Sequence, residues 1–209
     1  MRKAIIWDLD GTLLDSYDVI VESLYLALME HGVDIPREKI HQHAIAFSIQ
    51  SLLFQVSEQC GCAVESMQQR YSQISGGKYL DIKLMEGALE TLTSLQKAGA
   101  DHYVFTHRGR TTIPVLDNLH ITGFFREILT SQSGFRRKPD PEALLYLMEK
   151  HNLDPDNTYY VGDRALDMEC AKNAGIQGIL FLKPGCMDVS GAGETYVVTD
   201  LKDILKCMQ

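Results

Sequence analysis

The sequence predicts an α/β fold in which a parallel sheet is interrupted by an all-helical insert. Short, continuously apolar runs occur at Ala4–Trp7, Tyr103–Phe105 and Tyr159–Val161, and each ends in a polar residue. Such runs are typical of strands buried on both faces. Segments with helical spacing alternate with these runs over most of the chain, which favours parallel βα units. Residues from about 15 to 84 show helical spacing without strand alternation.

The elements can be placed in order along the chain. In the insert, helical pieces are expected after Ser16, after Pro36, over residues 45–56 and over residues 66–74, with Ser75-Gly76-Gly77 ending the last one. Elsewhere, helices are expected over residues 87–98, 111–119, 140–151 and 165–173, strands over residues 101–105, 127–129, 158–161 and 178–182, and a loop over residues 184–193. Residues 1–14 and 85–209 should therefore form the core domain, and residues 15–84 a helical domain.

The composition is that of an ordinary globular protein. Of the 209 residues, 45% are hydrophobic and 23% are charged, which suits one α/β core with a small insert. The net charge of −8 argues against nucleic acid as the main partner. No apolar run approaches the roughly 20 residues that a membrane helix needs, and the acids at Asp8 and Asp10 argue against a signal peptide. A cytoplasmic location is expected, and the five cysteines are expected to be reduced thiols.

Polar motifs follow the apolar runs at the point where each predicted strand ends. Asp8-Leu9-Asp10-Gly11-Thr12 follows the first run, Thr106 the second, and Gly162-Asp163, with Asp167 four residues later, the third; Lys138-Pro139 precedes a predicted helix. Because the carboxyl ends of parallel strands form one ligand crevice, the acids and the hydroxyl are expected at a common edge.

These residue types suit the handling of phosphate. A carboxylate such as Asp8 can attack phosphorus, and Asp10, brought back by a bend at Gly11, can transfer protons. Two carboxylates about 4 Å apart repel by about 4 kcal/mol at an effective dielectric near 20, so Asp8 and Asp163 favour a hard divalent cation such as Mg²⁺. Taken singly, each motif residue has a simpler explanation as a turn cap, a surface charge or a helix N-terminal acid.

The complete set, in this order, resembles the haloacid dehalogenase-like hydrolase superfamily, in particular its phosphoglycolate phosphatase and β-phosphoglucomutase branch. The resemblance implies a doubly wound, Rossmann-like core with an inserted helical cap, and Mg²⁺-dependent hydrolysis of a small phosphate monoester through an aspartyl-phosphate. The site residues that it implies are Asp8 as nucleophile and metal ligand, Asp10 as acid and base and, through its carbonyl, as metal ligand, Thr106 and Lys138 as phosphate ligands, and Asp163 as metal ligand. Asp167 is expected to act through a water molecule or by holding Lys138.

Substrate choice is the part that the sequence leaves open. His107 and Arg108 directly follow Thr106 and are the better candidates for substrate contact, whereas Tyr17 and Gln50 are weaker ones. The expected cap loop, residues 44–50, contains no Lys or Arg, unlike the basic loops of the resembling mutases. The expected partner is a small phosphorylated metabolite, with the chain acting as a monomer or homodimer and binding neither nucleic acid nor membrane.

Other classes of protein also use these residue types. A sugar-phosphate mutase of the β-phosphoglucomutase type would use the same residues, with an aspartyl-phosphate that outlives product exchange. A non-catalytic phosphate-binding relative should have lost Asp8 or Asp10. A phosphoacceptor receiver domain would carry its acceptor in the middle of a shorter chain, and a calcium-binding loop would need Glu where Val19 stands.

Overall fold

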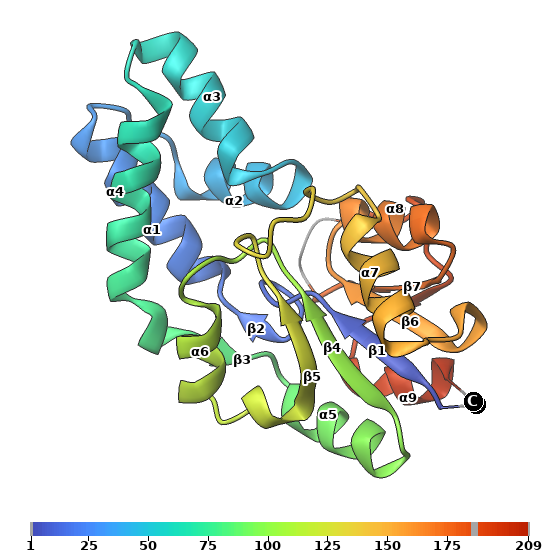
Figure 1. The fold of residues 1–209 in the computed structure, drawn as a ribbon. Coiled ribbons are helices and arrows are strands. Elements are labelled where there is room, and N and C mark those ends of the chain that lie inside the picture. The colour runs from blue at the N-terminus through green and yellow to red at the C-terminus, as the bar shows by residue number, and fades with distance from the viewer. Residues whose placement is uncertain (1, 185–187, 209) are drawn as a thin grey trace. The chain divides into compact units, whose positions relative to one another are not determined.

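The computed structural model describes residues 2–184 and 188–208, which fall into two compact units. The first comprises Met1–Asp15 and Leu84–Gln209, and the second comprises Ser16–Lys83. The first unit carries a parallel sheet and the second consists of helices (Figure 1). The predicted fold class, α/β with an inserted helical region, is confirmed.

A six-stranded parallel sheet forms the centre of the first unit. Its strand order is β5-β4-β1-β6-β7-β8. The strands are β1 (Ala4–Trp7), β4 (Asp101–Phe105), β5 (Phe125–Leu129), β6 (Thr158–Gly162), β7 (Gln177–Phe181) and β8 (Tyr196–Val198). The strand order reverses at β1, which has β4 on one side and β6 on the other. Such a reversal is the usual place for a ligand crevice in an open α/β sheet.

The register of β1 brings the polar motifs to one edge. Trp7 lies opposite Val104 in β4 and opposite Val161 in β6. The Asp8 N–H then donates to the Val161 carbonyl at 2.8 Å, which continues the pairing past the end of β1. The residues that follow β1, β4 and β6 therefore leave the sheet at the same level.

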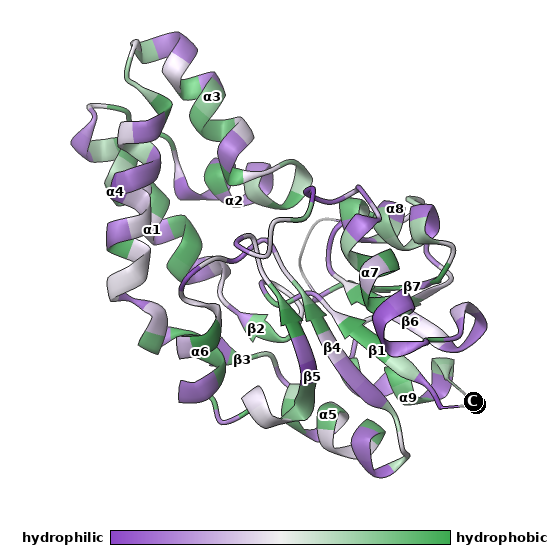
Figure 2. Ribbon diagram, in the orientation of Figure 1, coloured by the Kyte–Doolittle hydropathy of each residue, from purple (hydrophilic) through white to green (hydrophobic). Residues whose placement is uncertain are grey.

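Burial of apolar side chains explains why these runs form strands. All four residues of β1 are buried, and Figure 2 shows β1 as mostly hydrophobic ribbon. Ile6, Tyr103 and Tyr160 belong to a core cluster with the inner faces of α7 (Glu142–His151) and α8 (Ala165–Ala174). Successive side chains of a strand alternate between faces, so Ile5 and Trp7 are buried on the opposite face of the sheet.

The remaining elements of the first unit are short or peripheral. They are β2 (Leu14–Asp15), α5 (Ala88–Lys97), α6 (Thr112–Asn118), α9 (Ile204–Cys207) and the 3₁₀ turns η2 (Thr122–Phe124), η3 (Pro155–Asn157) and η4 (Leu201–Asp203). The strand β3 (Lys83–Leu84) spans the chain boundary between the two units. The helix α8 ends one residue later than predicted, at Ala174, and Gly175 caps it with a left-handed φ of 72°. The helix α7 begins slightly later than predicted, after Pro141, and Asp140 Oδ1 accepts a hydrogen bond from its first N–H at 3.0 Å.

The second unit contains α1 (Tyr17–Glu30), α2 (Arg37–Ala46), α3 (Ile49–Cys60), α4 (Val64–Gly77) and the 3₁₀ turn η1 (Tyr79–Asp81). Its core includes Leu24, Ile40, Leu53 and Met67. The predicted continuous helix over residues 45–56 is wrong, because Ser48 caps a new helix by accepting from Ser51 N at 3.0 Å. The predicted break at residues 75–77 is also wrong, since α4 runs through Gly77. Glycine disfavours a helix by only about 1 kcal/mol.

Two further expectations concern membranes and thiols. Among the described residues, no helix is long and apolar enough to cross a membrane. Cys60, Cys62, Cys170 and Cys207 are free thiols. Cys186 and residues 185–187 of the predicted loop lie outside the described residues.

Candidate active site

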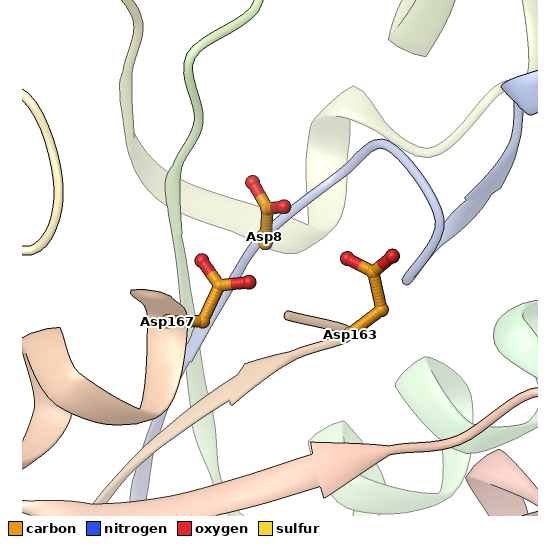
Figure 3. A group of neighbouring side chains, drawn as sticks. All are labelled: Asp8, Asp163 and Asp167. Carbon is orange, nitrogen blue, oxygen red and sulfur yellow. The ribbon is translucent and has the colours of Figure 1, made fainter. Parts of the chain in front are cut away.

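Three carboxylates meet where β1 and β6 end. Asp8 follows β1 directly, Asp163 follows β6, and Asp167 lies in the first turn of α8. Each offers an oxygen within 4.8 Å of the oxygens of the other two (Figure 3). Asp8 and Asp167 are buried, and Asp163 is partly exposed. This geometry concentrates negative charge at one edge of the sheet, all within the first unit.

A buried lysine lies between two of the three carboxylates. Lys138 Nζ is 2.8 Å from Asp8 Oδ1 and 2.7 Å from Asp167 Oδ1. It also lies 5.2 Å from the ring centroids of Phe105 and Tyr160. Burial alone would lower the pKa of Lys138, but the Asp167 and Asp8 carboxylates outweigh burial and raise it. Lys138 is therefore a fixed cation that touches both acids.

Asp167 is held in place from several sides. Besides Lys138, its Oδ2 accepts from the Arg164 backbone N–H at 3.2 Å, and the Tyr160 hydroxyl lies 3.3 Å from Oδ1. Gly162 leaves room for it, because a Cβ at position 162 would lie 2.4 Å from the Asp167 Cβ. Both Asp167 oxygens thus have protein donors, which favours the expectation that this residue holds Lys138.

Burial also affects the proton affinity of the groups around Lys138. Burial raises the pKa of Asp8, and nearby Asp167 adds to the rise while Lys138 opposes it. The pKa of the Tyr160 hydroxyl is raised well above its usual range, first by burial and then by the Asp167 charge. Tyr160 is therefore a neutral hydrogen-bond donor, whereas the excess negative charge near Asp8 calls for an additional cation.

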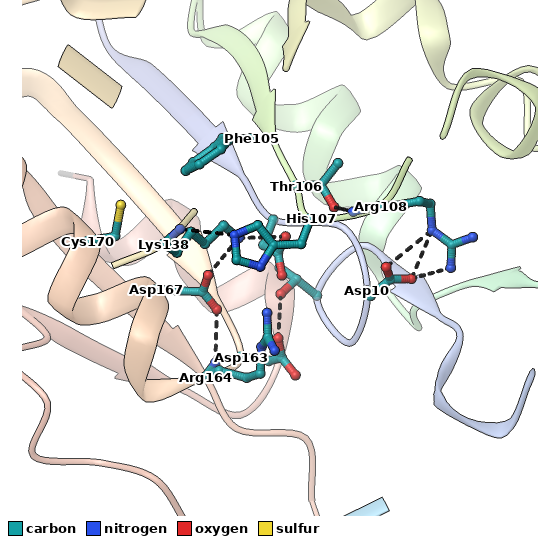
Figure 4. Close-up of polar contacts among 12 residues, drawn as sticks. Asp10, Phe105, Thr106, His107, Arg108, Lys138, Asp163, Arg164, Asp167 and Cys170 are labelled. Carbon is teal, nitrogen blue, oxygen red and sulfur yellow. Dashed lines mark hydrogen bonds and ion pairs between the residues drawn. The ribbon is translucent and has the colours of Figure 1, made fainter. Parts of the chain in front are cut away.

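Asp10 is directed away from this group. Arg108 Nε lies 3.1 Å from Asp10 Oδ1 and 3.2 Å from Oδ2, and Arg108 Nη2 also contacts Oδ1. Figure 4 shows the Asp10 carboxylate turned toward Arg108 rather than toward Lys138. Asp163 instead has a neighbour in the first motif, since Thr12 Oγ1 lies 3.4 Å from its Oδ1.

Thr106 and His107 both take part in hydrogen bonds within the protein. Thr106 is buried, its N–H donates to the Leu129 carbonyl at 3.0 Å, and its Oγ1 accepts from Arg108 N at 3.1 Å. His107 Nε2 accepts from the backbone N–H of Lys138 at 3.0 Å. Burial, followed by the charge of Lys138, lowers the pKa of His107 to about 2. His107 is thus a neutral ring that orients the Lys138 segment, and its predicted contact with substrate stays a prediction.

The carboxylate group suits a hard divalent cation. Its donors are all oxygens, and Asp8 and Asp163 come from neighbouring strand ends, as expected for Mg²⁺, which binds through one or two carboxylates together with water and phosphate. The Asp10 carboxylate is not part of the three-acid group. The metal contact that the family resemblance implies for Asp10 is made by its backbone carbonyl oxygen.

The weaker candidates lie in the helical unit. The Tyr17 ring packs edge-on against His41 at a centroid distance of 5.2 Å, and Gln50 is exposed in α3. Their contact with substrate stays a prediction.

Comparison with known proteins identifies the family. Residues 5–181 match the family model described as haloacid dehalogenase-like hydrolase. The chain belongs to this family. A phosphoglycolate phosphatase of Pseudomonas putida is 25% identical over 98% of this chain and 79% of its own length. The pyrophosphatase PpaX of Bacillus velezensis is 29% identical over 97% of this chain and 94% of its own length.

Solved structures support the same assignment of fold. A predicted phosphoglycolate phosphatase from Haemophilus somnus aligns with a TM-score of 0.87 and 24% identity, covering all of this chain and 98% of that one. A hydrolase from Pseudomonas syringae aligns with a TM-score of 0.79 and 25% identity, covering 98% and 97% of the two chains. The chain is thus an enzyme of the haloacid dehalogenase-like hydrolase family, similar to its phosphoglycolate phosphatases.

Sequence reasoning did not find every residue that shapes the site. Tyr160 was identified only as part of a buried strand, since nothing in an apolar run marks one hydroxyl as a neighbour of Asp167. The Arg164 backbone N–H carries no sequence signal. The Asp10–Arg108 pair spans 98 residues, so sequence spacing could not indicate it.

Proposed function

We propose that this chain is a Mg²⁺-dependent phosphatase that hydrolyses a small phosphate monoester through an aspartyl-phosphate on Asp8. The observation that carries the proposal is the Lys138 ammonium held between Asp8 and Asp167, beside Asp163. A buried cation in contact with a strand-end carboxylate is suited to bring a dianionic phosphoryl group up to that carboxylate, which is the step that repulsion would otherwise prevent.

In the first half of the proposed reaction, an Asp8 oxygen forms a bond to phosphorus while the ester P–O bond breaks. The leaving oxygen takes a proton from Asp10. Lys138 and the Thr106 hydroxyl bind the phosphoryl oxygens, whose charge rises in the transition state. Because Asp167 and the turn at His107 hold Lys138, and the Tyr160 hydroxyl in turn contacts Asp167, the ammonium needs little reorganisation during the reaction.

In the second half, water attacks phosphorus and the bond to Asp8 breaks. Asp10 accepts the proton from water, so the carboxylate of Asp8 and the acid form of Asp10 are both restored, and inorganic phosphate leaves. This order of steps differs from that of a mutase, in which a sugar hydroxyl would accept the phosphoryl group in place of water.

Asp8 and Asp163, with the Asp10 carbonyl, are the proposed ligands of Mg²⁺, and Asp167 is proposed to act on Lys138. When bound, the ion supplies positive charge that offsets repulsion between the carboxylates and the phosphoryl group. The helical unit, Ser16–Lys83, is proposed to be the cap that selects the leaving group.

The relatives support a small substrate. One is a phosphoglycolate phosphatase and another a pyrophosphatase, and both of those substrates are compact phosphate compounds. We propose a substrate of this size for the present chain, with phosphoglycolate as the first compound to test.

The proposal is tested by measuring phosphate release from phosphoglycolate, pyrophosphate, sugar phosphates, nucleotides and an aryl phosphate, with Mg²⁺ or a chelator. Wild type should release phosphate only with the metal, and Asp8→Asn should be inactive. Asp34→Asn, at an exposed acid of the helical unit, is the matched control and should keep full activity. Full turnover by Asp8→Asn would refute the nucleophile assignment, and conversion of sugar phosphates without release of phosphate would indicate a mutase.

A further inference from the structure

The ion pair between Asp10 and Arg108 is well formed and poorly accessible to water. The Asp10 and Arg108 side chains are 24% and 10% exposed. Arg108 uses Nε and Nη2 on the carboxylate, and its Nη1 donates to Thr111 Oγ1 at 3.1 Å. A planar fork of this kind is the arrangement in which arginine binds a carboxylate or a phosphate group most selectively.

This arrangement conflicts with the proposed work of Asp10. A residue that exchanges protons with the leaving oxygen must reach the atom next to the phosphoryl group, on the side of Asp8 and Lys138. The Asp10 carboxylate is directed to Arg108 instead (Figure 4). To act, Asp10 has to leave Arg108, and the loss of this largely buried ion pair is unfavourable unless another anion takes the place of the Asp10 carboxylate.

Arg108 is placed where a compact substrate can supply that anion. Its backbone N–H donates to Thr106 Oγ1 at 3.1 Å, so it stands directly beside a proposed ligand of the phosphoryl group. Its guanidinium contacts Asp10, which lies two residues after the proposed nucleophile Asp8.

We propose that Arg108 exchanges partners when substrate binds. A second anionic group of the substrate, either a carboxylate or a second phosphoryl group, replaces Asp10 as the ligand of the Arg108 guanidinium. Asp10 can then turn toward the leaving oxygen. The inference rests on the proposed phosphatase function and narrows it to doubly anionic substrates. The second charge then raises turnover as well as affinity, because the Asp10 carboxylate, once released from Arg108, can take up a proton from water and donate it to the leaving oxygen.

Matched pairs of substrates test the exchange. Phosphoglycolate is compared with 2-hydroxyethyl phosphate, which has the same length and a neutral end, and pyrophosphate is compared with methyl phosphate. Wild type should favour the doubly anionic member by about 10- to 100-fold in kcat/KM, the range of a charge-assisted hydrogen-bonded pair, with part of the difference in kcat. The comparison of phosphoglycolate with 2-hydroxyethyl phosphate measures the preference for a second group that is a carboxylate. The comparison of pyrophosphate with methyl phosphate measures the preference for a second phosphoryl group.

Variants of the arginine separate exchange from simple binding. Arg108→Gln should reduce the preference to about threefold or less and raise kcat for 2-hydroxyethyl phosphate, because Asp10 then loses its ion pair with Arg108. Arg108→Lys, which keeps the charge and loses the fork, should retain part of the preference. Arg110→Gln, at an exposed arginine of the same loop, should behave as wild type. Thermal unfolding of each variant checks that it folds.

Each other outcome is informative. A wild type that hydrolyses both members of each pair equally well would overturn the exchange and leave the phosphatase proposal standing. An Arg108→Gln variant that loses kcat on the neutral esters as well would also overturn it, since Arg108 would then be supporting Asp10. A wild type that releases phosphate from no ester would refute the proposed function itself.

Discussion

Replacing Gly162 with alanine should damage the candidate site from a position that touches neither substrate nor metal. Gly162 ends β6 directly before Asp163. A Cβ at this position would lie 2.4, 2.5 and 2.6 Å from Cβ, Cγ and Oδ2 of Asp167. Rotation of the Asp167 side chain cannot relieve the contact, because its Cβ moves only with the backbone. The strand β6 or the start of α8 must therefore shift by about 1 Å to reach ordinary contact distance.

The size of the effect follows from that shift. Overpacking of a well-packed interior costs about 1–3 kcal/mol, and Asp167 is fully buried. A displacement of about 1 Å would also move Lys138, which Asp167 contacts at 2.7 Å, and misplacement on this scale can cost about 100-fold in turnover. We expect Gly162→Ala to unfold at lower urea concentration and to show a lower kcat with a smaller change in KM.

A glycine with open surroundings provides the control. Gly76 lies inside α4, and a Cβ there would meet nothing within 4 Å. Gly76→Ala should therefore stabilise the protein by about 0.5–1 kcal/mol through helix propensity and leave turnover unchanged. The reasoning would be refuted if Gly162→Ala matched wild type in both urea midpoint and kcat.

Two further perturbations test other buried charges. Lys138→Met should lower the free energy of unfolding by about 3–5 kcal/mol, because two buried carboxylates lose their shared cation; adding Asp167→Asn should recover part of this loss in urea titrations, and an unchanged single variant would contradict the expectation. The pKa of His102 is lowered from 6.5 to about 4 by burial, and its Nδ1 accepts from Trp7 Nε1 at 3.0 Å. Because the unfolded state then binds the proton more tightly, stability should fall by up to about 3 kcal/mol as pH decreases from about 6.5 through about 4. His102→Gln keeps an acceptor without a titrating group and should flatten this part of the profile, read from the fluorescence of Trp7; an unchanged slope would show that other groups cause it.

The core fold could be predicted because its signals are local. The runs at Ala4–Trp7 and Tyr159–Val161 are continuously apolar and buried, as expected for strands covered on both faces, and the polar residues after them mark one sheet edge. Convergence of Asp8 and Asp163 follows from that rule, and Asp167 joins them because it lies four residues after Asp163, in the first turn of α8. The strand β8 was missed because it has three residues, two of them exposed, so it shows no apolar run.

Side-chain pairing was less accessible to sequence reasoning. The positions of Lys138 and Asp167 suggested that they could meet, but the direction of Asp10 depends on an arginine 98 residues away. The break between α2 and α3 depends on one serine side chain that caps a new helix, while apolar spacing continues across it. In both cases a specific hydrogen bond determines the local structure, and the hydrophobic pattern of the sequence cannot predict that hydrogen bond.

The central position of β1 affects how the chain can fold during synthesis. Both neighbours of β1 in the sheet, β4 and β6, follow the complete helical insert in the chain. At about 5–20 residues per second, an apolar segment made before the insert must wait several seconds or longer before it can pair in this sheet. Early folding of the helical unit would shorten the effective loop that separates these strands and lower the entropy cost of joining them. Substitutions that destabilise only Ser16–Lys83 should therefore slow refolding of the sheet, and refolding at an unchanged rate would show that the insert plays no such part.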